Sequence, residues 1–109
     1  MVKYQKQPKV VALDRLIYAI SDSTRRRIID DLVRGERNVG ELAEPFKMSA
    51  PAISKHIRVL HETGLINTRR VGRYIMCSLV ADNLMRVETW MAKYHRFWQT
   101  QLSEISKRQ

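Results

Sequence analysis

The sequence predicts a single, mainly α-helical domain that carries one small β-hairpin. Its 109 residues match the usual size of one domain, and a hydrophobic share of 44% can supply one core. Apolar residues recur at helical spacing in five stretches of the chain. After Gly64 the hydrophobic period shortens to two over two short runs, which is typical of β-strands.

A first helix is predicted over residues 10–20, because Leu13 and Ile17 repeat at helical spacing on one face. Residues 1–9 are polar and basic, and we expect them to form a flexible tail. The folded part of the chain is then one domain over residues 10–109.

A second helix is predicted over residues 23–34. The motif Ser21-Asp22-Ser23 offers side-chain oxygens that cap a helix N-terminus, and Gly35 offers a C-terminal stop. The arginines at positions 25–27 allow two interpretations: Arg26 and Arg27 contact phosphates, or Arg25 or Arg26 is a structural partner of Asp22.

Two short helices joined by a tight turn are predicted next. Asn38 caps a third helix, and Ser49 caps a fourth helix that Gly64 closes. Pro51 falls in the first turn of the fourth helix, where its missing N–H group costs little. The connection is expected to be about three residues long, which gives a helix-turn-helix pattern.

Two β-prone runs follow at residues 65–71 and 74–80, and they predict a β-hairpin around Gly72-Arg73. A helix-turn-helix followed directly by a basic hairpin is a winged helix-turn-helix. Asp82 is then expected to cap one long helix that ends near Ser106.

The long last helix favours a homodimer. About 24 residues would run about 36 Å, and one domain of this size cannot cover so long an apolar stripe. We therefore expect the first and last helices to form a twofold interface; the alternative is a last helix that folds back on its own core. The predicted interface residues are Leu13, Ile17, Leu84, Val87, Trp90, Met91, Tyr94, Phe97, Trp98 and Leu102.

The charge of the chain indicates a polyanionic partner. Twenty Lys and Arg residues stand against eleven Asp and Glu residues, for a net charge of +9. The excess lies in the middle of the chain, where residues 47–76 hold six basic side chains against the single acid Glu62. Such a field attracts phosphate backbones or anionic membranes, unless the surface is basic only for solubility.

Several sequence blocks resemble the ArsR/SmtB family of small winged-helix repressors. They are Asp22 to Ile29, with Ser23 where the family usually has proline; Glu41-Leu42-Ala43; Met48 to Leu60; Gly64-Leu65-Ile66; and Arg70 to Arg73. The resemblance covers almost the whole stretch from Leu13 to Ile105. It implies a homodimeric, sequence-specific regulator of transcription, and most often a repressor. Its two recognition helices would enter successive major grooves of double-stranded operator DNA, and an effector would loosen the complex.

A helical wheel separates two sides of the predicted recognition helix. Ile53, Ile57 and Leu60 form the buried side, and polar residues project from the other side into a major groove. His56 lies beside the buried stripe, so it either reaches a phosphate or is a half-buried structural residue. The predicted DNA contacts are Ser49, Ala50, Pro51, Ser54, Lys55, His56 and Arg58 on the helix, and Arg69, Arg70 and Arg73 in the wing.

The metal sites found in many members of the family have no counterpart in this sequence, so we expect no metal and no cofactor. Ala43-Glu44-Pro45 stands where the third-helix site needs cysteines. In the last helix, Asp82 lacks its histidine partner, and Trp98 stands three residues after His95 where a carboxylate is needed. Surface coordination through His95 with Glu88 or Asp82 is the remaining alternative.

Cys77 cannot form an internal disulfide, because it is the one cysteine of the chain. Its alternation with Ile75 and Leu79 favours a small buried hydrophobe over a redox switch. No phosphate loop or nucleophile motif occurs, so we do not expect an enzyme. No signal peptide or membrane span is visible, which indicates a cytoplasmic protein.

The main competing hypothesis is a winged-helix module that docks other proteins through the aromatic last helix. Such a module would show only non-specific affinity for DNA. The clustering of cations on the fourth helix and the hairpin argues against it, since protein docking does not need them. The effector stays open: an apolar ligand between the last helices, a partner protein, or none.

Overall fold

The computed structural model describes residues 11–108 of the chain. The predicted tail at residues 1–9 and the first residue of the predicted first helix, Val10, lie outside the described residues. In chain order the elements are α1 (Leu13–Ile20), α2 (Ser23–Val33), β1 (Arg37–Asn38), α3 (Val39–Ala43), α4 (Ala50–Glu62), β2 (Ile66–Val71), β3 (Tyr74–Leu79), α5 (Ala81–Ala92) and α6 (His95–Lys107).

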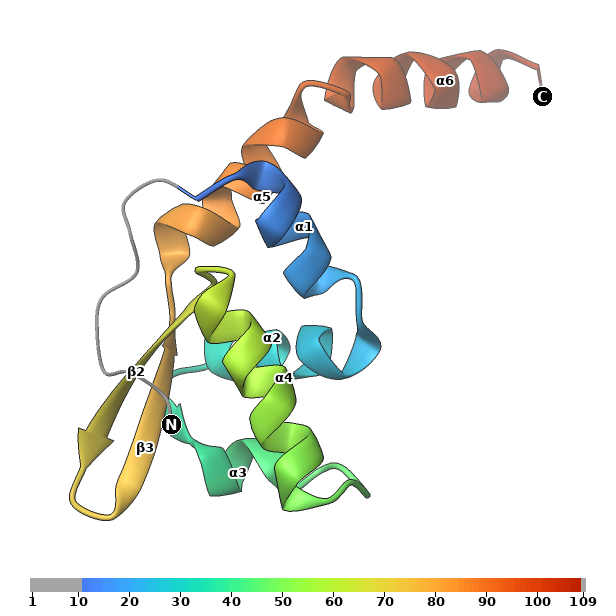
Figure 1. Ribbon diagram of the computed structural model, residues 1–109. Helices are drawn as coiled ribbons and strands as arrows, with labels where there is room; N and C mark the ends of the chain where they lie inside the picture. Colours follow the sequence, from blue (N-terminus) through green and yellow to red (C-terminus); the bar gives the residue numbers. More distant parts are fainter. Residues whose placement is uncertain (1–10, 109) are drawn as a thin grey trace.

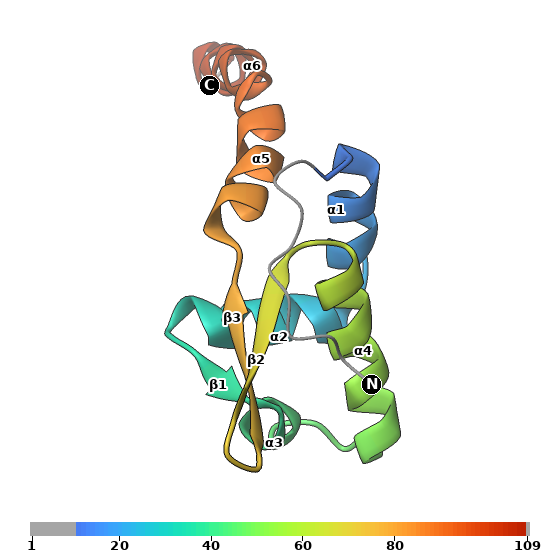
Figure 2. The same ribbon diagram turned by 60° about the vertical axis from the view of Figure 1, so that its left-hand side comes forward.

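Helix α2 lies at the centre of the fold, where it packs against α1, α4 and β3. The tip of the β2–β3 hairpin, α3 and the start of α4 gather at one end of the molecule, and α6 lies at the opposite end (Figures 1 and 2). This is the predicted winged helix-turn-helix. Its fully buried side chains are Leu16, Ile28, Leu42, Ile53, Ile57, Leu60, Leu65, Ile66 and Cys77.

The sheet has three antiparallel strands in the order β1-β3-β2. The hairpin was predicted, and its register pairs Val71 with Tyr74 across a two-residue turn. Gly72 has a φ of +59°, while no non-glycine residue of the described chain has a positive φ. Only the first turn residue is therefore left-handed, as in a type II′ turn. The sequence did not predict β1, because two residues are too few to show alternation.

Three predicted helix caps are present and explain where the helices begin. Asp22 accepts a hydrogen bond from the Arg25 amide at 3.0 Å, and Ser49 accepts one from the Ala52 amide at 3.3 Å. Asn38 and Glu41 form a reciprocal capping box at the start of α3. The connection between α3 and α4 spans residues 44–49 and is longer than expected, because α3 ends at Ala43.

The start of α5 corrects the predicted Asp82 cap. The N-cap residue is Val80, which makes no side-chain capping bond. Asp82 lies in the first turn, where its negative charge interacts favourably with the helix dipole. The buried side chain of Asn83 instead donates a hydrogen bond to the Gly64 carbonyl at 2.7 Å. This bond joins α5 to the end of α4, and Val11, which precedes α1, packs against the same Gly64.

The prediction of one continuous last helix was wrong. The helix breaks between Ala92 and His95, and the Tyr94 amide donates to the Met91 carbonyl, three residues back, at 3.0 Å. Neither glycine nor proline marks the break. The segment from Tyr94 to Trp98 is rich in aromatic residues and histidine of weak helix propensity, so a local change of hydrogen-bond pattern costs little there.

The break changes the shape of the molecule. Helix α5 packs against α1, whereas α6 projects as an arm away from the body (Figure 1). The described residues extend 59 Å in the longest direction but only 33 and 21 Å in the other two. Every described residue of α6 is exposed to solvent. The alternative in which the last helix folds back on its own core does not hold for this arm.

Candidate nucleic-acid interface

The predicted recognition helix, α4, has the two sides that the helical wheel indicated. Ile53, Ile57 and Leu60 are at most 1% exposed and pack into the core. The outward residues Ala50, Pro51, Ser54, Lys55 and Arg58 are all exposed. Because the buried positions anchor the helix, the outward side chains face solvent together in one orientation, at the end of the molecule that also holds the wing tip.

The N-terminal turn of α4 is the part best placed to enter a groove. The Ser49 side chain caps the helix, so its oxygen is already engaged in the structure. Pro51 stiffens the first turn without losing a helical hydrogen bond. A rigid first turn holds Ser54 and Lys55 one turn further along in a defined direction.

His56 contacts the start of α2. Its Nδ1 lies 3.3 Å from Nη1 of Arg25, which donates to it when Nδ1 carries no proton, and 3.7 Å from Oδ2 of Asp22. The ring is half-buried. This position agrees with the structural interpretation of His56, in which the ring orients the recognition helix.

Arg25 is the buried member of the three arginines at the start of α2. Its guanidinium donates to the carbonyls of Ala19 at 2.7 Å and Tyr18 at 3.1 Å, and it lies 5.2 Å from the centre of the Tyr18 ring. It therefore joins the end of α1 to α4 through His56. Arg26 and Arg27 are exposed; Arg26 donates to the Ile20 carbonyl, and Arg27 forms an ion pair with Asp31 at 3.3 Å.

Asp22 is held ionised by its neighbours. The hydrogen bond from the Arg25 amide, together with the positive charge that the His56 ring carries when protonated and the charge of Arg25, lowers the pKa of Asp22 against the opposing effect of burial. The negative charge stabilises the N-terminus of α2 and stands between α2 and the recognition helix.

The three wing arginines have different surroundings. Arg69 lies on the outer face of the hairpin, where its Nε donates to Glu36 Oε2 at 3.0 Å in a two-pronged ion pair that raises the pKa of Arg69. Arg70 lies on the other face and donates to the Gly72 carbonyl at 2.9 Å, so it braces the turn. Arg73 occupies the turn itself.

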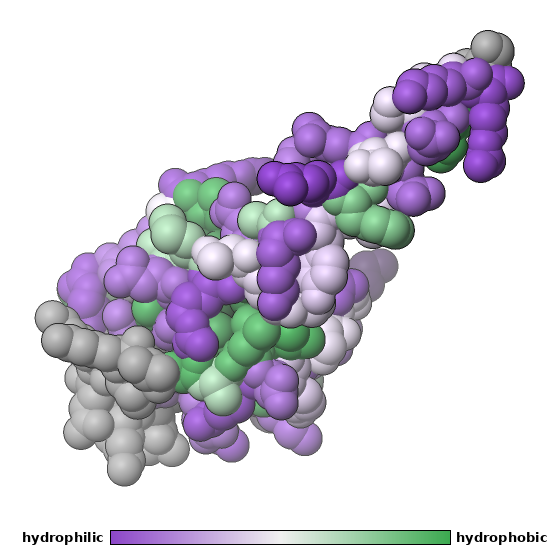
Figure 3. Space-filling model, turned by 90° about the horizontal axis from the view of Figure 1, so that it is seen from above, coloured by the Kyte–Doolittle hydropathy of each residue, from purple (hydrophilic) through white to green (hydrophobic). Residues whose placement is uncertain are grey.

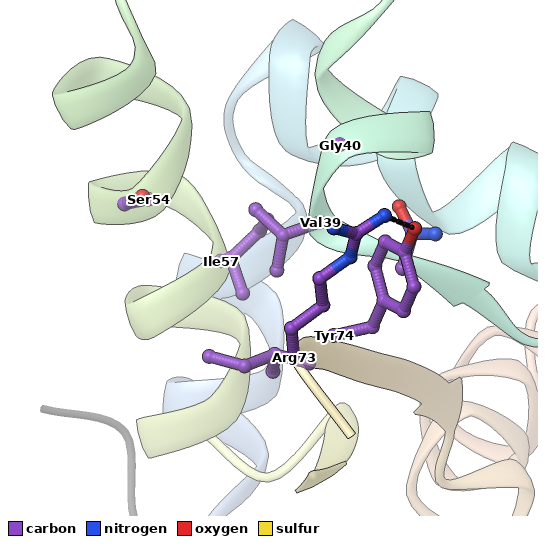
Figure 4. Close-up of a pocket in the computed structure, with 8 residues that line it drawn as sticks. Val39, Gly40, Ser54, Ile57, Arg73 and Tyr74 are labelled. Carbon is purple, nitrogen blue, oxygen red and sulfur yellow. Dashed lines mark hydrogen bonds between the residues drawn. The ribbon is translucent and has the colours of Figure 1, made fainter. Parts of the chain in front are cut away.

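Arg73 is folded onto Tyr74. Its Nη2 donates to the Tyr74 hydroxyl at 3.1 Å, and its guanidinium carbon lies 5.2 Å from the centre of the ring. Figure 4 shows the two side chains running together toward α3. Tyr74 is not among the residues predicted from the sequence; the signal that could have identified it is an aromatic residue directly after the Gly-Arg turn.

Cys77 is fully buried in β3, and burial raises the pKa of its thiol to about 12. The thiol is therefore protonated at neutral pH and unreactive, as the interpretation of Cys77 as a small hydrophobe requires. Within residues 11–108 no three His, Cys, Asp or Glu side chains are grouped so that they could hold a metal ion. No helix in that range is long and apolar enough to cross a membrane.

The residues predicted for the dimer interface divide into two groups. Leu13, Ile17, Leu84, Val87 and Trp90 are half-buried where α1 and α5 pack together. The second group continues through the break onto the arm and is 42–63% exposed; it comprises Met91, Tyr94, Phe97, Trp98 and Leu102, and Ile105 extends it. Viewed from above, hydrophobic side chains appear both on the body and along the arm (Figure 3).

The helix-turn-helix, the basic hairpin and the exposed polar face of α4 define a winged helix-turn-helix regulator. Residues 22–68 match the family model described as bacterial regulatory protein, arsR family. The chain is 37% identical over 82 residues to the transcriptional repressor SdpR of Bacillus subtilis, a match that covers 75% of this chain and 91% of that protein. The chain therefore belongs to the ArsR family of bacterial transcriptional regulators.

Solved structures agree with this assignment. The crystal structure of an ArsR family transcriptional regulator superposes with a TM-score of 0.73 at 37% identity, over 80% of this chain and 96% of that one. A DNA-binding domain from Mycobacterium bovis, described as homodimeric, superposes with a TM-score of 0.63 at 26% identity, over 76% of this chain and 80% of that one. The fold and the expectation of a non-enzymatic regulator are confirmed, and the protein-docking alternative gains no support.

Proposed function

We propose that the protein is a homodimeric repressor that binds an inverted repeat in double-stranded operator DNA. The observation that carries the proposal is the separation of two surfaces. The basic surface, formed by α4 and the wing tip, lies at one end of the molecule, and the apolar stripe of α5 and α6 lies at the other. Bound DNA and a partner subunit would then occupy different surfaces.

The recognition helix supplies the sequence-specific contacts. Ala50, Pro51, Ser54 and Lys55 lie on its first turns, which reach base edges when such a helix enters a major groove. Arg58 follows one turn later and contacts a base or a phosphate. Ser49 and His56 act indirectly by positioning the helix, because Ser49 caps it and the His56 ring packs against Arg25.

The wing supplies mainly electrostatic contacts. Arg73 at the tip and Arg70 beside it reach the minor groove or its flanking phosphates. Arg69 is paired with Glu36 on the outer face of the hairpin, so it adds a phosphate contact only if DNA replaces that carboxylate. We therefore rank Arg73 and Arg70 above Arg69.

The dimer joins α1, α5 and the α6 arm of each subunit to those of its partner. Five large apolar residues from Tyr94 to Ile105 are exposed along the arm. Exposed apolar surface of this kind is typical of a protein–protein interface. The homodimeric relative from Mycobacterium bovis supports a twofold assembly. In such a dimer the recognition helices lie about 34 Å apart, one turn of DNA.

Regulation does not use the family's usual metal sites, since their ligands are missing at the matching positions of the sequence. Surface coordination by His95 with Glu88 or Asp82 stays the weaker alternative. A protein that acts on chromosomal DNA in a bacterium works in the cytoplasm, so we place it there.

The test is a binding selection from random-sequence duplex DNA at near-physiological salt, with the enriched pool sequenced. The proposal expects an inverted repeat whose half-sites lie one turn apart. Binding is then compared between the enriched duplex and a shuffled duplex of equal length by fluorescence anisotropy. Equal affinity for the two duplexes, with a steep loss of affinity as salt rises, would show that the basic surface binds DNA only non-specifically. That result would overturn the proposal.

A further inference from the structure

A cavity of about 260 Å³ opens between α3, the recognition helix and the wing. Its floor includes the buried side chain of Ile57, and Val39 and Ile75 are half-buried in its walls. Ser54 of α4 lies across from Arg73 and Tyr74 of the wing, and all three are exposed at its mouth (Figure 4). An apolar cavity is unexpected on a surface that we assign to the polar DNA backbone.

The size of the cavity limits its ligands. A dry protein cavity of about 150 Å³ holds one benzene molecule, so this cavity has room for a ligand of one or two fused rings. The Tyr74 ring offers a flat aromatic surface, and Val39, Ile57 and Ile75 offer aliphatic contacts. These walls suit a flat, mostly apolar molecule.

The charge of the cavity selects an anion. Arg73 is the one charged side chain among the described residues that line it. Its guanidinium donates to the Tyr74 hydroxyl, and Arg73 forms no ion pair with a carboxylate of residues 11–108. A guanidinium has five N–H donors and binds carboxylates through two of them at once.

We propose that this cavity binds a small aromatic carboxylate, and that its occupation excludes DNA. The inference rests on the proposed function, because it takes Ser54 and Arg73 as DNA contacts. A bound carboxylate would hold the Arg73 guanidinium folded toward α3 and place the ligand ring beside Ser54. DNA requires both side chains to reach outward, so ligand and operator compete for the same groups and each lowers the affinity of the other.

Direct binding is measured by titrating the full-length protein with 2-naphthoate and recording amide and arginine side-chain NMR shifts. The matched control ligand is 2-naphthamide, which has the same rings and no charge. We expect saturable shifts at Val39, Ser54 and Arg73, with the amide at least about tenfold weaker, a difference of about 1.4 kcal/mol. Equal binding of both ligands, or shifts confined to the aromatic residues of α6, would overturn the proposal.

Variants test separately how the charge of Arg73 and the volume of the cavity contribute to ligand binding. Arg73→Gln is expected to bind 2-naphthoate and 2-naphthamide equally weakly, and Val39→Phe, which fills the cavity, is expected to bind neither. Because Val39→Phe alters a half-buried position, its circular dichroism spectrum is recorded first. Tyr74→Leu provides a second test at an exposed position, where loss of the aromatic surface should weaken 2-naphthoate several-fold.

Competition is measured with the selected operator. The apparent Kd for DNA should rise in proportion to the 2-naphthoate concentration once the cavity is occupied, and it should not change in Val39→Phe. If 2-naphthoate shifts the NMR signals at the cavity but leaves the affinity for the operator unchanged, ligand and DNA do not compete, and that part of the proposal is overturned. Since the NMR titration contains no DNA, a failure to find an operator contradicts the proposed function without affecting the binding result.

Discussion

The side chains of Arg25 and His56 meet at 3.3 Å and join the start of α2 to the recognition helix. Arg25 also donates to two carbonyls at the end of α1, and its residue is only 7% exposed. One buried guanidinium thus fixes three helices relative to one another. The orientation of α4, the proposed recognition helix, therefore depends on a contact with the start of α2.

Replacement of Arg25 by methionine should destabilise the fold by about 2–3 kcal/mol. The substitution keeps the apolar stem but removes the buried donor to the Ala19 carbonyl and one of the donors to the Tyr18 carbonyl, which also accepts from Ser21. Urea unfolding followed by circular dichroism measures the change. Arg27→Met is the matched control, since its exposed pair with Asp31 contributes less than about 1 kcal/mol. Equal losses in the two variants would contradict the bridging role of Arg25.

The lowered pKa of Asp22 predicts a loss of stability in acid. Its folded pKa lies below the unfolded value of 3.8, so its contribution is complete well above that value and is lost as the pH falls through the folded pKa. Asp22→Asn keeps a good helix cap but cannot titrate. The difference in unfolding free energy between wild type and Asp22→Asn should therefore shrink in acid. A difference that is constant with pH would show that the charge of Asp22 does not contribute.

Lys55 and Arg73 should affect DNA binding in different ways. Lys55→Ala removes a base contact and should cost about 1–3 kcal/mol on the operator, with a smaller loss on shuffled DNA. Arg73→Ala removes a phosphate contact, so it should weaken both complexes and reduce the slope of log K against log salt by about 0.9. Lys107→Ala, in the distant arm, is the control. An unchanged salt slope in Arg73→Ala would show that Arg73 of the wing does not contact a DNA phosphate.

The arm should hold the dimer together. Trp98→Glu places a charge in the exposed apolar stripe of α6 and should shift the protein from dimer to monomer in sedimentation velocity. Ser103→Glu adds the same charge on the opposite side of the same helix, and it should remain dimeric. Dissociation of both variants, or of neither, would argue against the arm as the interface. A monomer should also bind the inverted repeat far more weakly.

Cys77 should be inert in the native protein. With a pKa of about 12, the thiol is protonated at pH 8 and buried, so alkylation by iodoacetamide should require unfolding. Mass spectrometry of native and urea-treated samples tests this. Cys77→Ala should retain operator affinity under oxidising and reducing conditions. Labelling of the folded protein at the rate of the unfolded one would revive a redox role.

Helix caps, the tight turn and the helical periodicity could be predicted from the sequence, because each depends on residues that lie close together in the chain. Asp22, Asn38 and Ser49 cap helices where the sequence placed caps, because capping bonds span only three residues. The Gly72-Arg73 turn lies where the period of two is interrupted, since the backbone twist of a tight hairpin requires a left-handed glycine. The buried side of α4 follows from helical periodicity alone.

Other features depend on contacts between segments far apart in the chain. The helix break before His95 is marked by neither glycine nor proline, only by residues of weak helix propensity, so the sequence predicted one continuous helix there. The pairing of Arg69 with Glu36, a residue 33 positions earlier in the chain, depends on the packing of the hairpin beside β1. The cavity between α3, α4 and the wing exists only once these elements meet.

The sequence by itself determined the winged helix-turn-helix, the concentration of basic residues on α4 and the wing, and the ArsR resemblance, because each depends on local spacing, capping residues or charge. Only the tertiary structure decided that His56 packs against Arg25, that the last helix becomes a projecting arm and that an apolar cavity lies beside the wing. The physical reason is the distance along the chain over which each interaction acts. Periodicity and caps act over a few residues, whereas the orientation of a side chain is set by whichever distant element packs against it.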